Sequence, residues 1–392
     1  MASAAEPTLD RGPVTDASPI RVALVIPTLD RGGAEKQFCL LACGLRQRGF
    51  DVDVVLLTHD GPLRETLDAA GVPVTLIGKR FKADPTAYFR LRRWLSRWRG
   101  DVVHSWLFAA NAYARAAARS VGTPVVLGSE RCVDLWKTSA HFAIDSWLAA
   151  RTDGITTNSP GVRDFYAGHG IPASQFHVIP NGIPSRSATM ISRAEACNRL
   201  EVDPRRYLIL AVGRLWPQKR YRDLIWAAEL LGTTRGDSTL VIIGDGPQNA
   251  ELLRHRDAVS TPDHVRFAGH RADVAELLPH ADLFWNASEY EGQSNAIIEA
   301  MQAGICVVAS DIPGNRDLVT DGETGKLVPV GDRAAFARVS NLLFDAGDDR
   351  RRMGEAASER IASDFTVGQM VTAHIALYRR LVAAKSAKNG KK

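Results

Sequence analysis

The 392-residue chain has only five cysteines, and none of them stands in a spacing typical of a zinc site. Cys39 and Cys43 share one face of a predicted helix, but no second pair completes a metal site. An odd number of scattered cysteines is typical of small buried residues in a reducing compartment. Acidic metal ligands are missing too, because the Asp-x-Asp at residues 51–53 begins a predicted strand instead of ending one. The sequence therefore predicts neither a bound metal nor a cofactor.

Long apolar runs are absent as well. No stretch of the chain approaches the ~18 apolar residues of a membrane span. The first nineteen residues are rich in Ala, Pro and Asp and lack the basic and apolar regions of a signal peptide. We expect residues 1–19 to form a disordered leader and residues 386–392 a disordered tail. The expected location is the cytoplasm, with peripheral association at the inner face of the membrane.

Several nucleotide-binding and catalytic signatures are also missing. The chain has no P-loop, no G-x-G-x-x-G and no nucleophile elbow with a Ser-His-Asp arrangement. Gly244-Asp245-Gly246-Pro247 begins like a dinucleotide loop, but no third glycine follows, which favours a turn that closes a strand. Charge of one sign is not dominant either: a net charge of +5 fits nucleic acid, an anionic membrane or an acidic ligand.

What the chain contains is a repeated alternation of short apolar strands with stretches of helical spacing. Predicted strands cover residues 21–28, 52–57, 74–77, 101–104, 124–128, 154–157, 176–179, 207–212, 240–243, 265–267, 283–285, 306–309 and 326–329. This alternation predicts an α/β fold with parallel sheets covered on both faces. A polar break near residues 181–205 divides it into two halves. We place the domains at residues 20–185 and 186–366, followed by a terminal helix over residues 367–385.

Two glutamates, Glu291 and Glu299, bracket a short polar loop and the start of a predicted helix. An ionised carboxylate only accepts hydrogen bonds, so it suits the hydroxyl groups of a sugar or a ribose. The loop between them offers backbone N–H groups at a helix N-terminus, where phosphate binds. Hydroxyl, phosphate and hydroxyl are the groups of a nucleotide sugar, so the segment predicts a site for one.

Two further loops follow predicted strands, which is where open α/β sheets bind ligands. In the loop that begins at Gly213, the guanidinium of Arg214 and the ammonium of Lys219 can converge on one diphosphate. Gly32-Gly33 precedes a predicted helix, so a phosphate can approach its backbone there. A plain tight turn has the same glycine pattern, and this alternative stays open.

His104 and the pair Glu130-Arg131 each end a predicted strand of the first half. At such a position His104 can hydrogen-bond a sugar hydroxyl, whereas a lone histidine is more often structural. Glu130 and Arg131 are candidates for contact with an acceptor.

The segment 79–99 is rich in Lys and Arg, has one acidic residue and carries five aromatic residues. One helical face of it combines Tyr88, Leu91, Leu95 and Trp98. A basic amphipathic helix of this kind can lie on an anionic membrane surface. The alternative is a crossover helix that buries its apolar face on the sheet and keeps its basic face in solvent.

Taken together, these residues resemble family 4 of the glycosyltransferases, retaining enzymes of the GT-B fold. The resemblance covers almost the whole chain from residue 21. It is carried by Gly32-Gly33-Ala34-Glu35, Asp101-Val102-Val103-His104, Ile179-Pro180-Asn181-Gly182-Ile183, Gly213-Arg214-Leu215 with Lys219, Gly244-Asp245-Gly246-Pro247, Val265-x-Phe267-x-Gly269, the Glu291/Glu299 motif, Ala300-Met301, Gly304 and Gly322-x-x-x-x-x-Val328. The resemblance implies a GT-B architecture of two Rossmann-like doubly wound parallel-sheet domains that face a central cleft. The terminal helix would cross back to the first domain.

The resemblance also implies an activity and a set of site residues. The enzyme would be a metal-independent hexosyltransferase of polysaccharide biosynthesis that moves a sugar from a UDP- or GDP-linked donor to a glycan or lipid-linked acceptor, with no nucleic-acid partner. Its catalytic residues would be His104, Arg214, Lys219 and Glu291. Its donor-binding residues would be Gly32, Gly33, Gly213, Arg214, Lys219, Gly246, Glu291, Gly292, Gln293, Ser294, Asn295 and Glu299. In that set the diphosphate would lie on Arg214 and Lys219, the ribose on Glu299 and the donor sugar on Glu291, with His104 near the reacting centre.

Two positions depart from the family pattern. Gln293-Ser294 replaces the aromatic residue and second glycine that many members carry, and Pro184 replaces an aspartate at the end of the hinge motif. Three other functions stay open on the sequence. They are a nucleotide-sugar epimerase of similar fold, a glycan phosphorylase with a pyridoxal cofactor, and a non-catalytic binder of nucleotide sugars, membranes or nucleic acid.

Overall fold

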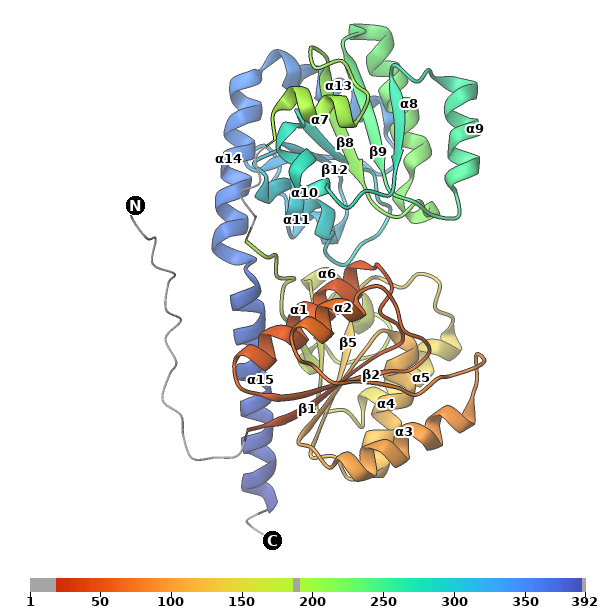
Figure 1. Cartoon of the computed structure of the whole chain (residues 1–392), viewed down its shortest axis with the longest axis vertical. Coiled ribbons are helices and arrows are strands. Elements are labelled where there is room, and N and C mark those ends of the chain that lie inside the picture. The colour runs from red at the N-terminus through yellow and green to blue at the C-terminus, as the bar shows by residue number, and fades with distance from the viewer. Residues whose placement is uncertain (1–18, 186–190, 390–392) are drawn as a thin grey trace.

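The computed structural model describes residues 19–185 and 191–389, so the predicted leader, except for its last residue, lies outside the described residues. Figure 1 shows two α/β lobes stacked one above the other, with two consecutive long helices, α14 and α15, running along one side. Each lobe has its own parallel sheet, and the predicted organisation as two parallel-sheet α/β domains is confirmed.

The first domain is built on a sheet with the strand order β3-β2-β1-β4-β5-β6-β7. Its strands are β1 (Arg21–Ile26), β2 (Asp51–Leu56), β3 (Val74–Leu76), β4 (Val102–Trp106), β5 (Val125–Glu130), β6 (Gly154–Thr157) and β7 (Phe176–Val178). Its helices are α1 (Gly33–Gln47), α2 (Arg64–Ala69), α3 (Pro85–Trp98), α4 (Phe108–Ser120), α5 (Ser139–Ala149), α6 (Pro160–Ala167) and the short 3-10 helix η1 (Ala173–Gln175). The strand order reverses between β1 and β4, so the loops after these two strands diverge and leave room for a ligand.

Helices cover both faces of this sheet because its strands are apolar on both sides. In β1, Val22, Leu24 and Ile26 pack with α1, α2 and α15 on one face. The intervening Ala23 and Val25 pack with α3 and α4 on the other. The alternation of the strand therefore fixes which helices share a layer.

The second domain repeats the scheme with the strand order β10-β9-β8-β11-β12-β13. Its strands are β8 (Tyr207–Val212), β9 (Ser238–Ile243), β10 (Val265–Gly269), β11 (Leu283–Asn286), β12 (Val307–Ser310) and β13 (Gly325–Val328). Its helices are α7 (Arg193–Arg199), η2 (Pro217–Lys219), α8 (Tyr221–Arg235), α9 (Asn249–Val259), α10 (Val274–Leu277), η3 (Leu278–His280), α11 (Asn295–Gln302), α12 (Pro313–Arg316), α13 (Arg333–Asp345) and α14 (Gly347–Asp364). The strand order reverses between β8 and β11. This point of reversal, or switch point, lies opposite the switch point between β1 and β4 of the first domain.

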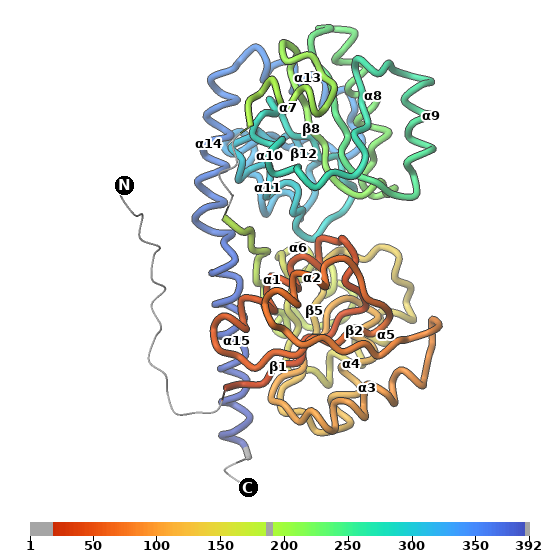
Figure 2. Tube along the Cα trace, in the orientation of Figure 1, coloured from red at the N-terminus to blue at the C-terminus, as the bar shows by residue number. Residues whose placement is uncertain are grey.

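The chain passes between the domains twice, as the trace in Figure 2 shows. The first passage follows β7, and the second leads from α14 into α15 (Val367–Asn389). The two passages touch, because the Ile183 N–H donates to the carbonyl of Phe365 at 2.7 Å and Ile183 pairs with Thr366 in an isolated bridge. Two chain segments in contact with each other therefore connect the domains.

Helix α15 belongs to the first domain by packing although it comes last in the chain. Met370, Val371 and Tyr378 are buried in the core that α1, β4 and β5 also form. The helix ends at Asn389, beyond the predicted end at residue 385, so part of the predicted tail is helical. No glycine or proline interrupts residues 369–389, and nothing in the sequence stops the helix earlier.

Helix α3 shows that the basic segment 79–99 uses its apolar face inside the protein. Leu91, Leu95 and Trp98 are buried against the sheet, and the Trp98 indole donates to Asp53 at 2.7 Å. A parallel sheet needs such cover, so the crossover interpretation of the segment is correct and its apolar face is not free for a membrane. None of the helices in the described part of the chain is long and apolar enough to cross a bilayer.

Two buried histidines, His374 within α15 and His104 in contact with it, give a prediction about acid stability. Burial lowers the pKa of His374 to about 3 and that of His104 well below its usual range. The folded chain therefore binds fewer protons than the unfolded chain below pH 6.5, and its stability falls as pH drops from 6.5 toward 3. We expect His374 alone to lower the free energy of unfolding by ~1.4 kcal/mol per pH unit in that window. Urea unfolding at pH 7 and pH 5 should show a smaller loss in His374→Asn, and an equal loss would contradict this account.

Candidate functional site

The candidate site lies between the two switch points, where loops of both domains meet. On the side of the first domain, Gly33 begins α1 after β1. On the side of the second domain, the loop after β8 carries Gly213 to Lys219, and the loop after β11 carries Glu291 to Asn295. Asn295 donates from its side-chain amide to the carbonyl of Gly33 at 3.1 Å. The predicted donor residues of the two domains are therefore brought together.

The loop before α11 is fixed by the hinge. The backbone N–H of Asn181 donates to the Gln293 side chain at 2.9 Å, and its amide group donates to Asn295 at 2.7 Å. Gln37 of α1 forms two hydrogen bonds of 2.8 Å with the backbone of Gly182. The first bond within α11 runs from Ile298, so the three N–H groups ahead of it stay available at the N-terminus of the helix.

Glu291 is buried and already has partners of its own. Lys219 donates to its carboxylate, and the Ser288 hydroxyl donates to the same oxygen at 2.8 Å. The predicted diphosphate residue and the predicted sugar residue are therefore in direct contact. A carboxylate held by a lysine is a weak nucleophile, which favours a role in positioning hydroxyl groups.

Arg214 lies at the mouth of the same loop. Its guanidinium is exposed and stacks over the Trp216 ring at 4.8 Å. Burial raises the pKa of the Glu35 carboxyl in the first domain, and the positive charge of Arg214 partly opposes this. The carboxylate of Glu35 folds back against Gly32 at the start of α1.

Lys36 is a site residue that the sequence analysis missed. It donates to Glu299, the residue predicted to hold the ribose, and so ties α1 to α11. Lys36 follows directly on Gly32-Gly33-Ala34-Glu35. A lysine in the first turn of a helix is common, so its position in the sequence did not indicate a role in the site. A ribose that binds Glu299 has to share this carboxylate with the Lys36 ammonium.

Glycine is needed in the loops after β8 and β9 because the backbones of these two loops pack directly on each other. A Cβ on Gly244 would lie 2.0 Å from the carbonyl oxygen of Gly213, and one on Gly246 would lie 2.6 Å from that of Leu215. Gly213 and Gly244 also have φ values of 155° and 149°. The Gly244-Asp245-Gly246-Pro247 segment is therefore a turn that supports the Lys219 loop, as its spacing favoured.

The structure corrects the prediction for His104. Strand β4 continues two residues beyond it, so His104 lies inside the strand and is fully buried. Its two ring nitrogens contact the Tyr378 hydroxyl at 2.7 Å and the Thr156 hydroxyl at 3.0 Å. The residue holds α15 on the sheet and does not face a donor sugar. The side chain that ends β4 is Trp106.

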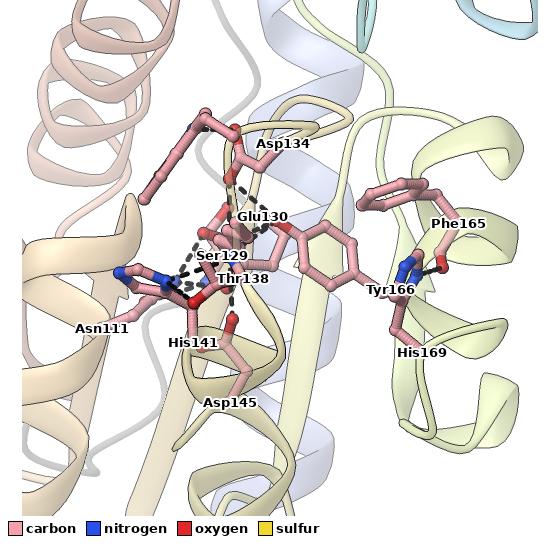
Figure 3. A network of polar contacts seen from close by, with 12 residues as sticks. Asn111, Ser129, Glu130, Asp134, Thr138, His141, Asp145, Phe165, Tyr166 and His169 are labelled. Atoms are coloured by element: carbon pink, nitrogen blue, oxygen red, sulfur yellow. Dashed lines mark hydrogen bonds and ion pairs between the residues drawn. The ribbon is translucent and has the colours of Figure 1, made fainter. Parts of the chain in front are cut away.

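Glu130 is corrected in the same way. It is buried and accepts hydrogen bonds from Asn111 at 2.9 Å and from the Tyr166 hydroxyl at 3.1 Å. Lys137 lies 3.3 Å from it and also pairs with Asp145 at 2.9 Å. Figure 3 shows Glu130 among Asn111, Asp134 and Asp145, with the Tyr166 hydroxyl pointing toward it. Glu130 is therefore part of a buried charge network and is not exposed to an acceptor.

Arg131, the other acceptor candidate, lies directly after β5 at the contact between the domains. Its guanidinium stacks on Trp106 at 4.4 Å and donates to the Asn181 side chain. Its backbone carbonyl faces Gly292, where an added Cβ would lie only 2.0 Å away. The closed arrangement of the two domains therefore depends on a glycine at position 292.

This close approach predicts the effect of a single methyl group. Gly292→Ala should push the loop before α11 away from Arg131 and lower turnover about tenfold or more, since small misplacements in an active site have large costs. Gly368→Ala is the matched control, because an added Cβ there meets only Thr366 at 3.9 Å. Activity assays and small-angle scattering of both variants check this. Unchanged turnover in Gly292→Ala would show that the closed contact is not needed.

Comparison with known proteins gives the same picture. Residues 31–186 match the model of Glycosyltransferase Family 4, and residues 192–360 match that of Glycosyl transferases group 1. Glycogen synthase of Mycobacterium tuberculosis is 30% identical over 298 residues, which cover 72% of this chain and 69% of that protein. The Escherichia coli UDP-Gal:alpha-D-GlcNAc-diphosphoundecaprenol alpha-1,3-galactosyltransferase is 25% identical over 358 residues, or 86% and 90% of the two chains. The crystal structure of Anabaena HepE with UDP and glucose has a TM-score of 0.83 at 20% identity and covers 92% of this chain and 100% of that one.

The fold and these matches define a glycosyltransferase of the GT-B fold that uses a nucleotide sugar. The predicted fold class is thereby confirmed. The chain belongs to glycosyltransferase family 4, as its motifs indicated.

Proposed function

We propose that the protein transfers a hexose from a UDP- or GDP-linked donor to a glycan or lipid-linked acceptor, with retention of configuration and without a metal ion. The observation that carries the proposal is the contact of Lys219 with Glu291, which places a cation beside the loop that leads to the N-terminus of α11, with Arg214 earlier in the loop that carries Lys219. Two cations and free N–H groups suit a diphosphate, and Glu291 and Glu299 beside them suit hydroxyl groups. Related solved structures hold UDP or UDP-glucose, which supports a donor of this class.

In the proposed reaction, the bond between the anomeric carbon and the diphosphate breaks and negative charge grows on the leaving oxygen. Arg214, Lys219 and the N-terminus of α11 stabilise that charge, and each strong donor contributes ~2.7–4 kcal/mol to lowering the barrier. Glu291 is held by Lys219 and Ser288, so it orients the sugar instead of attacking it. The acceptor hydroxyl attacks from the same face, and the departing phosphate oxygen takes its proton. Closure of the domains excludes water from this step.

A membrane-associated acceptor is supported by one layer of the first domain. Helices α3, α4 and α5 pack side by side, at the lower right of Figure 1. Together they contain a single acidic residue, Asp145, and it is buried in an ion pair with Arg115. Basic residues of α3 and the exposed Phe89, Ile144 and Trp147 lie on the same layer. A surface with cations and aromatic side chains but no exposed acid on its helices fits an anionic lipid surface.

The donor proposal is tested by thermal unfolding with a panel of nucleotide sugars, since a ligand that binds the folded state raises the melting temperature. Turnover of the stabilising donor is then followed over a panel of glycan and lipid-linked acceptors, and the anomeric configuration of the product is read by NMR. Inversion would overturn retention. Interconversion of the donor without an acceptor would indicate an epimerase, and loss of activity in EDTA would overturn metal independence.

The membrane part of the proposal has its own test. Co-sedimentation with vesicles that contain phosphatidylglycerol should be strong at low salt, and Ile144→Ser with Trp147→Ser should weaken it. Equal binding to neutral vesicles, or none to anionic ones, would contradict a basic, aromatic docking surface.

A further inference from the structure

Arg131 differs from the other fully buried arginine of the first domain in its partners. Arg115 is 1% exposed and pairs with Asp145 at 3.1 Å, so its charge is compensated. Arg131 is 7% exposed, and no carboxylate in the described part of the chain forms an ion pair with it. Burial alone lowers the pKa of its guanidinium to about 9. A buried charge without a counter-charge is strongly unfavourable, so its presence needs an explanation.

The hydrogen bonds of Arg131 are incomplete as well. Only one of its terminal nitrogens has an acceptor, in Asn181, while Nε and Nη1 donate to nothing within the described residues. The indole Nε1 of Trp106, the ring beneath the guanidinium, is a third buried donor with no partner there. Buried donors are normally paired, and several of them in one place mark a site whose acceptor comes from outside the chain.

The position of Arg131 suggests when that acceptor binds. Arg131 follows β5 at the carboxyl edge of the first sheet, opposite the loop that carries Glu291. Gly292 covers its backbone, and the Asn181 side chain that it contacts is held by Gln293 and Asn295. The second domain thus covers the backbone of Arg131, while its guanidinium lies between Trp106 of the first domain and Asn181 of the hinge. Separation of the domains would remove Gly292 and release the Asn181 side chain, which opens the hinge side of the guanidinium to a ligand.

We propose that Arg131 binds a phosphate group of a substrate from the first-domain side of the cleft, as the counter-charge that the protein does not supply. The free Nε–H and Nη1–H groups lie on two different edges of the guanidinium, so phosphate oxygens can accept from either of them, and a second N–H of Nη2 can complete a bidentate contact. The phosphate can belong to the donor diphosphate or to a phosphorylated acceptor. The acceptor is favoured because Arg214 and Lys219 of the second domain already face the donor diphosphate in the proposed function, on which this inference rests.

The test compares Arg131→Met with the unmodified full-length chain, by thermal unfolding with inorganic phosphate and with UDP or GDP. Without ligand, Arg131→Met should melt at the same or a higher temperature, because it removes an uncompensated buried charge. Inorganic phosphate added to the nucleotide-saturated unmodified chain should give a further stabilisation that Arg131→Met loses, with at least tenfold weaker binding. If nucleotide binding weakens instead, the phosphate is that of the donor. Arg151→Met, which removes an exposed arginine stacked on Trp147 at 4.2 Å, is the matched control.

Arg131→Lys separates charge from geometry, because it keeps a cation but loses the two-pronged contact. It should retain part of the phosphate response. The proposal is overturned if Arg131→Met melts at a lower temperature and binds phosphate and nucleotide as the unmodified chain does, which would make Arg131 a structural residue. Failure of every nucleotide to bind the unmodified chain would instead overturn the proposed function, and the response to inorganic phosphate alone would still decide the role of Arg131.

Discussion

We expect the Lys219→Ala variant to turn over its donor at least ~100-fold more slowly than the unmodified chain. Lys219 is held in place by Glu291, and in the proposed mechanism it lies where the leaving diphosphate gains charge. Its removal takes away one strong donor and also frees Glu291 to repel the phosphates. Arg214→Ala should have a similar effect. Among the described side chains only the Trp216 ring contacts the Arg214 guanidinium, so its N–H groups are free to bind the phosphates in the proposed mechanism.

The measurement is kcat under saturating donor, with circular dichroism to verify the fold. Arg222→Ala is a suitable control, because the exposed Arg222 belongs to the same domain and pairs with the half-buried Glu251 at 3.3 Å. This control should retain the turnover of the unmodified chain. A Lys219→Ala variant with near-normal kcat would remove the phosphate role of Lys219, and with it the main support for the proposed mechanism.

The largest expected effect on stability comes from Lys137→Met. The Lys137 side chain is fully buried between Glu130, Asp134 and Asp145, so its loss leaves three carboxylates with only Arg115 beside them. Removal of one partner from a buried ion-pair network costs about 3–5 kcal/mol. Urea unfolding at pH 7 should show a loss of this size in the free energy of unfolding of the first domain.

The loss in Lys137→Met should shrink as the pH is lowered. Burial already raises the pKa of Glu130, so its neutral form becomes accessible first and relieves the repulsion. The penalty is therefore complete above that raised pKa and falls below it. Arg205→Met is the control, since the exposed pair of Arg205 with Asp203 contributes at most ~1 kcal/mol. Equal stability of Lys137→Met and the unmodified chain would show that the network carries little of the folding energy.

The positions of the strands along the chain could be predicted from the sequence because each strand is a short apolar run bounded by polar turns. Every predicted strand is found, with ends that differ by up to two residues. Such a shift is harmless for the fold but decisive for a site. Two more residues in β4 move His104 from the edge of the sheet to its interior and make Trp106, which is buried as well, the last residue of the strand.

The parts that could not be predicted depend on contacts between distant segments. Glu130 and Arg131 are neighbours in sequence, yet one enters a network with Lys137 and the other lies against Gly292. The ion pair of Lys36 with Glu299 joins residues 263 positions apart, and no local pattern indicates it. The residues predicted to bind the diphosphate, Arg214 and Lys219, could be chosen from the sequence because their loop follows a strand directly, and such loops meet where two doubly wound sheets face each other.

Helix α15 has a consequence for how the protein is made. The strands of the first domain are complete at Val178, but Met370 and Tyr378 close its core. At ~5–20 residues per second, a ribosome needs about 10–40 s to add the intervening chain. During that time the apolar surface that α15 later covers is exposed to solvent or to a chaperone. A stop codon early in α15 would therefore destabilise the first domain, although that domain is synthesised first.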